Sequence, residues 1–417
     1  MESKKTDELD NYEILIAKKY ALDARKKLGS GSTGVVYLGK ELKTKNLVAI
    51  KLEYKDHYPS LLKNEFKIYK ELQGVENIPK IHFFGDQGNF FILIMDLLGP
   101  SLKDHMNFIK KPFSLSTTLK ISIQLLNIIK NIHKKGVLLR YIKPENMAIG
   151  RGDNEKYVYL IDFGLSKRYI KHGMHSQYKK GKRRKGNIYF ISINAHFGVK
   201  ISRRDDIESL GYNLVYFMKG KFPWSNLSSK EVREKKLKTS LDELCQGLPE
   251  EFKEFINYAR KLQFTEEPDY NYLNSLLLKA AEKNKIDINT VKYDWVIYNE
   301  NLQKEKNVES NEIESKEKEV NKEEMQVKEA ENKKTENTKK DEEGKISENV
   351  ENGKVQISED IEKEQNKTNG KIENEKAEAE INKISECVEN ENEKGKSQIN
   401  EDKTNINIEK SETIHEI

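Results

Sequence analysis

Apolar residues in the first hundred positions follow a pattern that is mainly typical of β-strands. From Tyr20 onward, residues 28–38 combine glycines with β-branched residues, and residues 47–53 are mostly apolar. Together they predict a hairpin with a glycine-rich tip. Residues 61–72 instead have helical spacing, and Phe90–Met95 predicts a short buried strand.

The pattern becomes helical after a Gly-Pro pair at residues 99–100. Apolar residues recur every three or four positions and predict helices at residues 115–133, 205–218, 250–262 and 272–283. A β-rich part of about 80 residues followed by a mostly helical part is typical of an α+β protein. We therefore expect a bilobal fold, with a small β-rich N-lobe and a larger α-helical C-lobe.

A change in composition near residue 300 ends this pattern. Residues 301–417 carry 21 Lys, no Arg and 33 acidic residues, a net charge of −12, and contain no Phe, Tyr, Trp or Pro. The first 300 residues carry 53 basic and 36 acidic residues. A segment with so little apolar surface cannot offset the entropy of ordering. We expect residues 299–417 to be a disordered or transiently helical low-complexity tail, and residues 1–17 to be a polar lead.

Cysteines and apolar runs limit the possible environments. Cys245 and Cys387 are too few for a disulfide framework or a thiolate metal site, which favours a reducing compartment. The first residues are charged, and the longest apolar run is much shorter than the roughly 20 residues of a membrane span. We expect a soluble monomer in the cytoplasm or nucleus, without membrane or specific nucleic-acid partners.

A glycine-rich motif precedes a strand that carries a lysine. The two segments read Gly29-x-Gly31-x-x-Gly34-x-Val36 and Val48-Ala49-Ile50-Lys51. Glycines let a backbone close over phosphate groups, and Lys51 would supply a cation for the α- and β-phosphates of ATP. Such a lysine needs an acidic partner, and Glu65 on the next predicted helix is the candidate. We expect these two residues to form an ion pair.

Two further motifs predict catalytic and metal-binding residues. Residues 138–146 read Leu-Leu-Arg-Tyr-Ile-Lys-Pro-Glu-Asn, close to the kinase catalytic-loop pattern of His-Arg-Asp, four residues and Asn. Asp162-Phe163-Gly164 follows. Asp162 and Asn146 predict a Mg²⁺ site, because hard oxygen ligands and ATP phosphates are what this ion prefers. The motifs in this order predict a protein-kinase fold that binds ATP and Mg²⁺.

Three other stretches carry a closer resemblance. They are residues 95–102, Met-Asp-Leu-Leu-Gly-Pro-Ser-Leu; residues 192–196, Ser-Ile-Asn-Ala-His; and residues 202–212, Ser-Arg-Arg-Asp-Asp-Ile-Glu-Ser-Leu-Gly-Tyr. With these motifs the chain resembles the casein kinase 1 family of serine/threonine kinases, in which Ser-Ile-Asn stands where most kinases have Ala-Pro-Glu. The match, from about Lys18 to Trp295, implies a kinase domain at residues 18–298, with the N-lobe at 18–97 and the C-lobe at 98–298.

The resemblance also implies roles for single residues, together with ATP, Mg²⁺ and protein substrates or signalling partners. Met95 would be the gatekeeper beside adenine, Asp96–Leu98 the hinge, and Asp206 a buried residue that binds the catalytic-loop backbone. The expected nucleotide-binding residues are Gly29, Ser30, Gly31, Gly34, Val36, Ala49, Lys51, Glu65, Met95, Asp96, Leu98 and Asp162, with Asn146 and Asp162 at the metal.

Tyr141 occupies the position of the catalytic Asp, beside Lys143 and Asn146 in the catalytic set. In the family this Asp accepts the proton of the substrate hydroxyl. Phenols titrate at about pH 10, and loss of a general base typically costs about 10²–10⁴ in rate. One hypothesis is a pseudokinase that binds Mg-ATP as a scaffold or regulator. The other is an active but slow serine/threonine kinase, because phosphoryl transfer needs little base catalysis.

Two changes concern substrate recognition. The resemblance implies a basic anion site that binds acidic or phosphorylated substrates. Tyr189 stands where the resemblance implies an arginine of this site. The loop after Trp224 is also several residues shorter than the resemblance implies. We expect phosphosubstrate recognition to be altered along with the base.

A basic run, Lys179–Lys185, remains in the activation segment. It is compatible with a nuclear-import signal, a surface for acidic partners or a solvated charge run. It could also bind the acidic tail of the same chain, because a flexible tether keeps the local concentration high.

Overall fold

The computed structural model describes residues 13–31, 33–56, 59–181, 186–308 and 310. The chain divides into two compact units, residues 1–314 and 315–417, and the described residues all belong to the first. Predictions for the acidic tail beyond residue 310, for residues 1–12 of the polar lead and for residues 182–185 of the basic run therefore lie outside the described residues.

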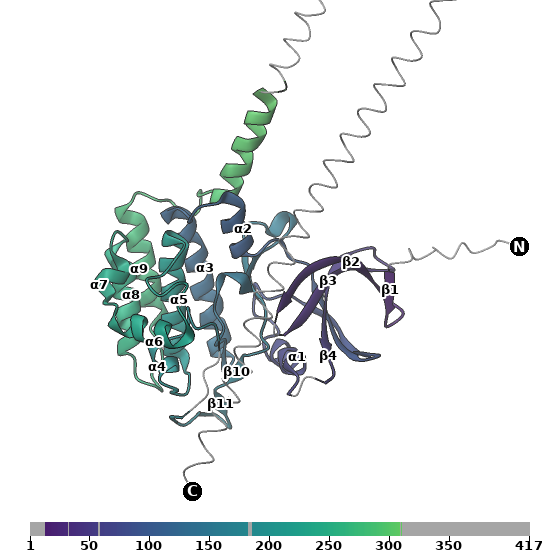
Figure 1. Cartoon of the computed structure of the whole chain (residues 1–417), viewed down its shortest axis with the longest axis horizontal. Coiled ribbons are helices and arrows are strands. Elements are labelled where there is room, and N and C mark those ends of the chain that lie inside the picture. Colours follow the sequence, from purple (N-terminus) through teal and green to yellow (C-terminus); the bar gives the residue numbers. More distant parts are fainter. Residues whose placement is uncertain (1–12, 32, 57–58, 182–185, 309, 311–417) are drawn as a thin grey trace, which may run out of the picture. The chain divides into compact units, whose positions relative to one another are not determined.

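A six-stranded antiparallel sheet forms the N-lobe (Figure 1). Its strands are β1 (Glu13–Ile16), β2 (Tyr20–Gly31), β3 (Gly34–Glu41), β4 (Leu47–Tyr54), β5 (Ile81–Gln87) and β6 (Phe90–Asp96), in the order β1-β2-β3-β4-β6-β5. The predicted hairpin and the strand β6 are confirmed. The pattern did not predict β1 or β5, and β1 lies inside the expected polar lead. It pairs with β2 and buries Ile16, so the sheet begins within the last residues of that segment.

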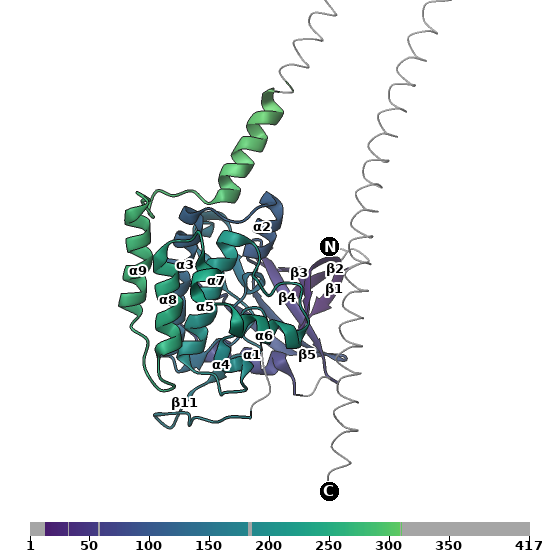
Figure 2. The same ribbon diagram turned by 60° about the vertical axis from the view of Figure 1, so that its left-hand side comes forward.

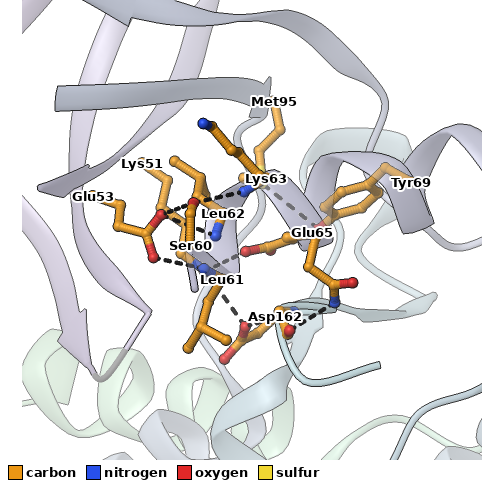
Figure 3. Close-up of polar contacts among 12 residues, drawn as sticks. Lys51, Glu53, Ser60, Leu61, Leu62, Lys63, Glu65, Tyr69, Met95 and Asp162 are labelled. Atoms are coloured by element: carbon orange, nitrogen blue, oxygen red, sulfur yellow. Dashed lines mark hydrogen bonds and ion pairs between the residues drawn. The ribbon is translucent and has the colours of Figure 1, made fainter. Parts of the chain in front are cut away.

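The helix α1 (Leu61–Glu71) packs against this sheet, as its spacing predicts. Ser60 caps it by accepting a hydrogen bond from the Lys63 amide at 3.1 Å. A second acceptor comes from the sheet, because a carboxylate oxygen of Glu53 on β4 accepts from the Leu61 amide at 2.8 Å (Figure 3). The first turn of α1 is thus fixed to the strand that carries Lys51.

Helices form the C-lobe. They are α2 (Leu102–Ile109), α3 (Leu115–Lys134), α4 (Ile193–His196), α5 (Arg203–Lys219), α6 (Ser229–Lys238), α7 (Leu241–Cys245), α8 (Glu250–Lys261) and α9 (Tyr270–Lys283). The four long helices α3, α5, α8 and α9 lie side by side (Figures 1 and 2) and match the predicted segments to within two residues. The bilobal α+β fold is therefore confirmed. The shorter helices α2, α4, α6 and α7 were not predicted.

Short strands and turns position the loops between the lobes. The strands are β7 (Val137–Leu138), β8 (Met147–Ile149), β9 (Val158–Leu160), β10 (Lys167–Arg168), β11 (Ile170–Lys171) and β12 (Met174–His175), with 3₁₀ turns at Pro144–Asn146 and Gly152–Asn154. β7 pairs with β10, and β8 pairs with β9. These pairs bracket residues 139–146 and 161–166, so they bring the catalytic loop beside the Asp162 motif.

Residues 294–308 form a further helix that continues past the expected domain boundary at residue 298. It is anchored at its start, where Trp295 is 7% exposed and its ring stacks on His105 with centroids 4.1 Å apart. Within the described ranges, no helix is both long and apolar enough to cross a membrane.

Candidate active site

Lys51 and Glu65 meet between β4 and α1. The Nζ of Lys51 lies 2.7 Å from Glu65 Oε2 and 3.4 Å from Asp162 Oδ1 (Figure 3). The Lys51 and Glu65 side chains are 6% and 1% exposed. The expected ion pair is therefore present, and the same lysine also contacts the predicted metal ligand.

Burial and charge shift the pKa values of Lys51 and Glu65 in opposite directions. Burial raises the pKa of Glu65 to about 7, the Lys51 ammonium opposes this rise, and the Asp162 carboxylate adds to it. Burial alone would lower the pKa of Lys51, but the two carboxylates outweigh it and raise the pKa. Lys51 therefore remains a cation at neutral pH, as a residue that binds phosphate must.

The three glycines of the loop differ in what constrains them. A Cβ placed on Gly29 or Gly31 would meet no atom within 4 Å. Gly34 has φ +121°, and a Cβ there would lie 2.2 Å from the Leu52 carbonyl oxygen. Gly34 is thus required by the packing of β3 on β4. Gly29 and Gly31 instead leave open space beside the backbone of β2, which suits a ligand that approaches the main chain.

A buried carboxylate holds the start of the catalytic loop. Asp206 on α5 accepts hydrogen bonds from the amides of Leu139 and Arg140, each at 2.8 Å. His133 Nε2 lies 2.9 Å from the same carboxylate. The expected contact of Asp206 with the catalytic-loop backbone is confirmed. Leu139, at the usual His position, is buried in the hydrophobic core.

Tyr141 places an aromatic ring where a carboxylate is expected. The Nζ of Lys143 lies 4.7 Å from the ring centroid, within the range of a cation–π contact. The Tyr141 carbonyl accepts a hydrogen bond from Asn146 Nδ2 at 3.1 Å. Since the amide nitrogen of Asn146 faces the loop backbone, its oxygen is the atom left to ligate a metal ion.

The predicted hinge has its gatekeeper in the expected strand position. Met95 is buried and lies opposite Ala49 in the β4–β6 register. The Asp96 side chain accepts from the Lys80 amide at 2.9 Å and lies 2.7 Å from His82 Nε2. Asp96 and Leu98 also line a groove of about 450 Å³ that Met95 and Ala49 do not line. The Asp96 side chain is thus occupied by its contacts with Lys80 and His82.

Tyr189 is fixed by a lysine that the sequence did not single out. The Nζ of Lys236 donates to the carbonyls of Tyr189 and Ile191, at 3.0 and 2.6 Å, and Trp224 Nε1 also donates to the Tyr189 carbonyl, at 3.1 Å. Lys236 is 1% exposed, and burial holds its pKa well below its usual range. Lys236 and Trp224 therefore both hold the main chain at Tyr189.

Three residues of the site were missed in the sequence: Glu53, Asn64 and Lys236. Glu53 is two positions after Lys51 on the same strand, so the period of two places both side chains on one face. That spacing was a usable signal. Asn64 and Lys236 lie in polar stretches without any motif, and only their tertiary contacts identify them.

The sequence was also compared with models of known protein families. The model described as the protein kinase domain matches residues 22–286, more than half of the chain. The matched region includes the glycine-rich hairpin, the Lys51–Glu65 pair, the catalytic loop and the Asp162 motif. This chain belongs to the protein kinase family.

Proposed function

We propose that this protein is a casein kinase 1-like pseudokinase, which binds Mg-ATP and acts as a scaffold or regulator with little or no phosphotransfer to protein Ser or Thr. One observation carries the proposal. Tyr141 stands at the catalytic position of the loop, while Lys51 contacts both Glu65 and Asp162. The nucleotide half of the site is built as in a kinase, and the proton-accepting half is not.

The residues present fit Mg-ATP. Lys51 would bind the α- and β-phosphates, and the open backbone at Gly29 and Gly31 leaves room for them. The oxygens of Asp162 and Asn146 would hold Mg²⁺, which neutralises charge on the phosphates when it is bound. The buried Glu65 keeps the lysine oriented toward Asp162.

The changes around the substrate support reduced transfer. Tyr141 presents an aromatic ring in place of the carboxylate that accepts the proton of a substrate hydroxyl in kinases, and this ring engages Lys143. Tyr189 replaces the arginine that the family resemblance implies in the anion site, and Lys236 next to it is buried. A phosphorylated or acidic peptide therefore loses both its orienting base and part of its docking charge.

The second candidate is an active but slow serine/threonine kinase. The loose transition state of phosphoryl transfer is stabilised mainly by positioning and by charge. The charged residues that would do this, Lys51, Glu65 and Asp162, are all present. The contact of Lys51 with both Glu65 and Asp162 favours this alternative.

Binding and turnover measured on the full chain separate the two candidates. We expect the wild type to bind Mg-ATP in a fluorescent-nucleotide displacement assay and to transfer no measurable phosphate from labelled ATP to itself or to an acidic serine peptide. Tyr141→Asp should gain transfer, and Asp162→Asn should abolish that gain in the double variant. Wild-type transfer that disappears in Asp162→Asn and barely rises in Tyr141→Asp would establish the slow kinase.

Protein partners, a monomeric state and a cytoplasmic or nuclear location remain part of the proposal. The predicted contact between the acidic tail and the basic run Lys179–Lys185 stays a prediction. Its test is the hydrodynamic size of the full chain and of residues 1–314 at low and high salt, since an electrostatic contact weakens as salt rises.

A further inference from the structure

Asn64 joins α1 to the loop that follows Asp162. Its Nδ2 donates to the carbonyl of Gly164 at 2.8 Å and to the carbonyl of Ser166 at 3.1 Å. The residue directly precedes Glu65 on the helix, so two neighbouring side chains link α1 to the Asp162 loop, residues 162–166. Glu65 acts through Lys51, and Asn64 acts on the loop backbone.

We propose that Asn64 is a positioning residue that fixes the Asp162 loop and keeps α1 in place without a charge or a phosphate. The proposal deepens the proposed function and rests on it for its nucleotide readout. In protein kinases the placement of this helix is commonly controlled by phosphorylation of the activation segment. Two amide–carbonyl hydrogen bonds hold the same parts here, and neither requires a modified residue.

The geometry of the loop explains why it needs such support. Asp162 has φ +63°, in the left-handed region that few non-glycine residues adopt. Its Oδ1 lies 3.4 Å from both the Gly164 amide and Lys51 Nζ, at the long end of hydrogen bonding. The 2.8 Å bond from Asn64 to Gly164 is therefore the shortest of these side-chain contacts.

The N-terminus of α1, three residues before Asn64, is fixed independently. Ser60 Oγ donates to a carboxylate oxygen of Glu53, and the same carboxylate accepts the first helical amides, from Leu61 at 2.8 Å and Leu62 at 3.2 Å (Figure 3). Because β4 holds the N-terminus of α1, the helix presents the Asn64 side chain to the loop from a fixed position. Loss of Asn64 should release the loop and leave α1 folded.

The test uses the full chain and two substitutions. Asn64→Ala removes the donor. Asn64→Asp keeps the size of the side chain, but a carboxylate cannot donate to two carbonyls and would face them with like charge. Asn284→Ala is the matched control, because the Asn284 amide also donates to a carbonyl, that of Ala280 at 2.8 Å, at the end of α9.

The first readout is amide hydrogen exchange without nucleotide. We expect residues 162–166 to lose protection in both Asn64 variants and to stay protected in Asn284→Ala. The second readout is the affinity for ADP with and without Mg²⁺. We expect the Asn64 variants to weaken Mg-ADP binding about tenfold and metal-free ADP binding much less, a shift in their ratio that general destabilisation would not give. Phosphatase treatment of the wild type should change neither readout.

Three outcomes would overturn the proposal: wild-type exchange at residues 162–166 in both Asn64 variants, an unchanged Mg²⁺ ratio in a protein that binds ADP, or loss of loop protection after phosphatase treatment. If the wild type binds no nucleotide, the proposed function fails, and hydrogen exchange still decides the role of Asn64.

Discussion

Lys143 lies over the ring of Tyr141, with its Nζ 4.7 Å from the ring centroid. In a loop with the usual carboxylate, the same lysine would stand beside a negative charge. Here it faces the weak negative potential of an aromatic face. The tyrosine therefore also changes the electrostatics at Lys143, a second member of the expected catalytic set.

Replacement of Tyr141 tests this relationship. Tyr141→Asp should raise phosphotransfer by about 10²–10⁴, the usual contribution of a general base. Tyr141→Phe keeps the ring and removes only the hydroxyl, so it should leave transfer at the wild-type level. The measurement is initial-rate phosphate incorporation at saturating Mg-ATP. Measurable transfer by the wild type that disappears in Tyr141→Phe would instead show that the phenol hydroxyl takes part in transfer.

The buried pair of Lys51 and Glu65 makes a prediction about stability. Lys51→Met should lower the free energy of unfolding by about 3–5 kcal/mol at pH 8, because it leaves a buried carboxylate unpaired. Lys51→Met with Glu65→Leu should recover much of this loss and still fail to bind nucleotide. Denaturant unfolding and nucleotide binding measure the two effects. A double variant as unstable as the single one would contradict the assignment of the loss to the unpaired charge.

Gly34 and Gly31 form a matched pair of positions in the glycine-rich loop. Gly34→Ala should destabilise the fold by more than about 1 kcal/mol, because its φ is +121° and its Cβ would clash with the Leu52 carbonyl. Gly31→Ala, whose Cβ meets no atom within 4 Å, should leave thermal stability nearly unchanged and weaken Mg-ATP binding. Equal melting temperatures for the two variants would contradict the steric argument, and unaltered affinity in Gly31→Ala would place the phosphates elsewhere.

Asp205 predicts a dependence of stability on pH. It accepts from Ser192 Oγ at 2.5 Å and from the Ser202 amide at 2.7 Å, yet burial raises its pKa to about 7. Between about pH 4 and 7 the folded state keeps a proton that the unfolded chain releases. This group therefore lowers the free energy of unfolding as the pH rises through that range and adds no further change above it.

Asp205→Asn, which does not titrate, isolates this effect. The difference in unfolding free energy between the wild type and the variant should change in favour of the variant from pH 4.5 to pH 7.5. Glu65 contributes a slope of the same sign to both proteins and cancels in the difference. Parallel curves over this range would show that Asp205 is already ionised in the folded state at low pH.

The long elements of the fold could be predicted because their burial is either periodic or continuous. α3 and α8 each bury an apolar face, and β6 buries Ile92, Leu93 and Ile94 in succession. α6 buries only Val232 and Lys236, so its sequence gives a very weak helical signal. Among residues 14–16, β1 buries only Ile16, and its pairing with β2 decides its conformation.

The same distinction applies to the site. Lys51, Glu65 and Asp206 belong to motifs with fixed spacing, and their contacts were expected. Asn64 and Lys236 act through main-chain carbonyls that are distant in sequence, and carbonyls leave no trace in the amino-acid pattern. Contacts of a side chain with the backbone of another segment therefore need the tertiary structure.

The attachment of the first turn of α1 both to β4 and to the loop after Asp162 has a kinetic consequence. A helix that must swing inward before a ligand can bind adds a slow unimolecular step, and the observed association rate then reaches a plateau as the ligand concentration rises. Glu53 and Asn64 already hold this helix beside the Asp162 loop. Nucleotide should therefore associate in a single step, at a rate that rises linearly with its concentration.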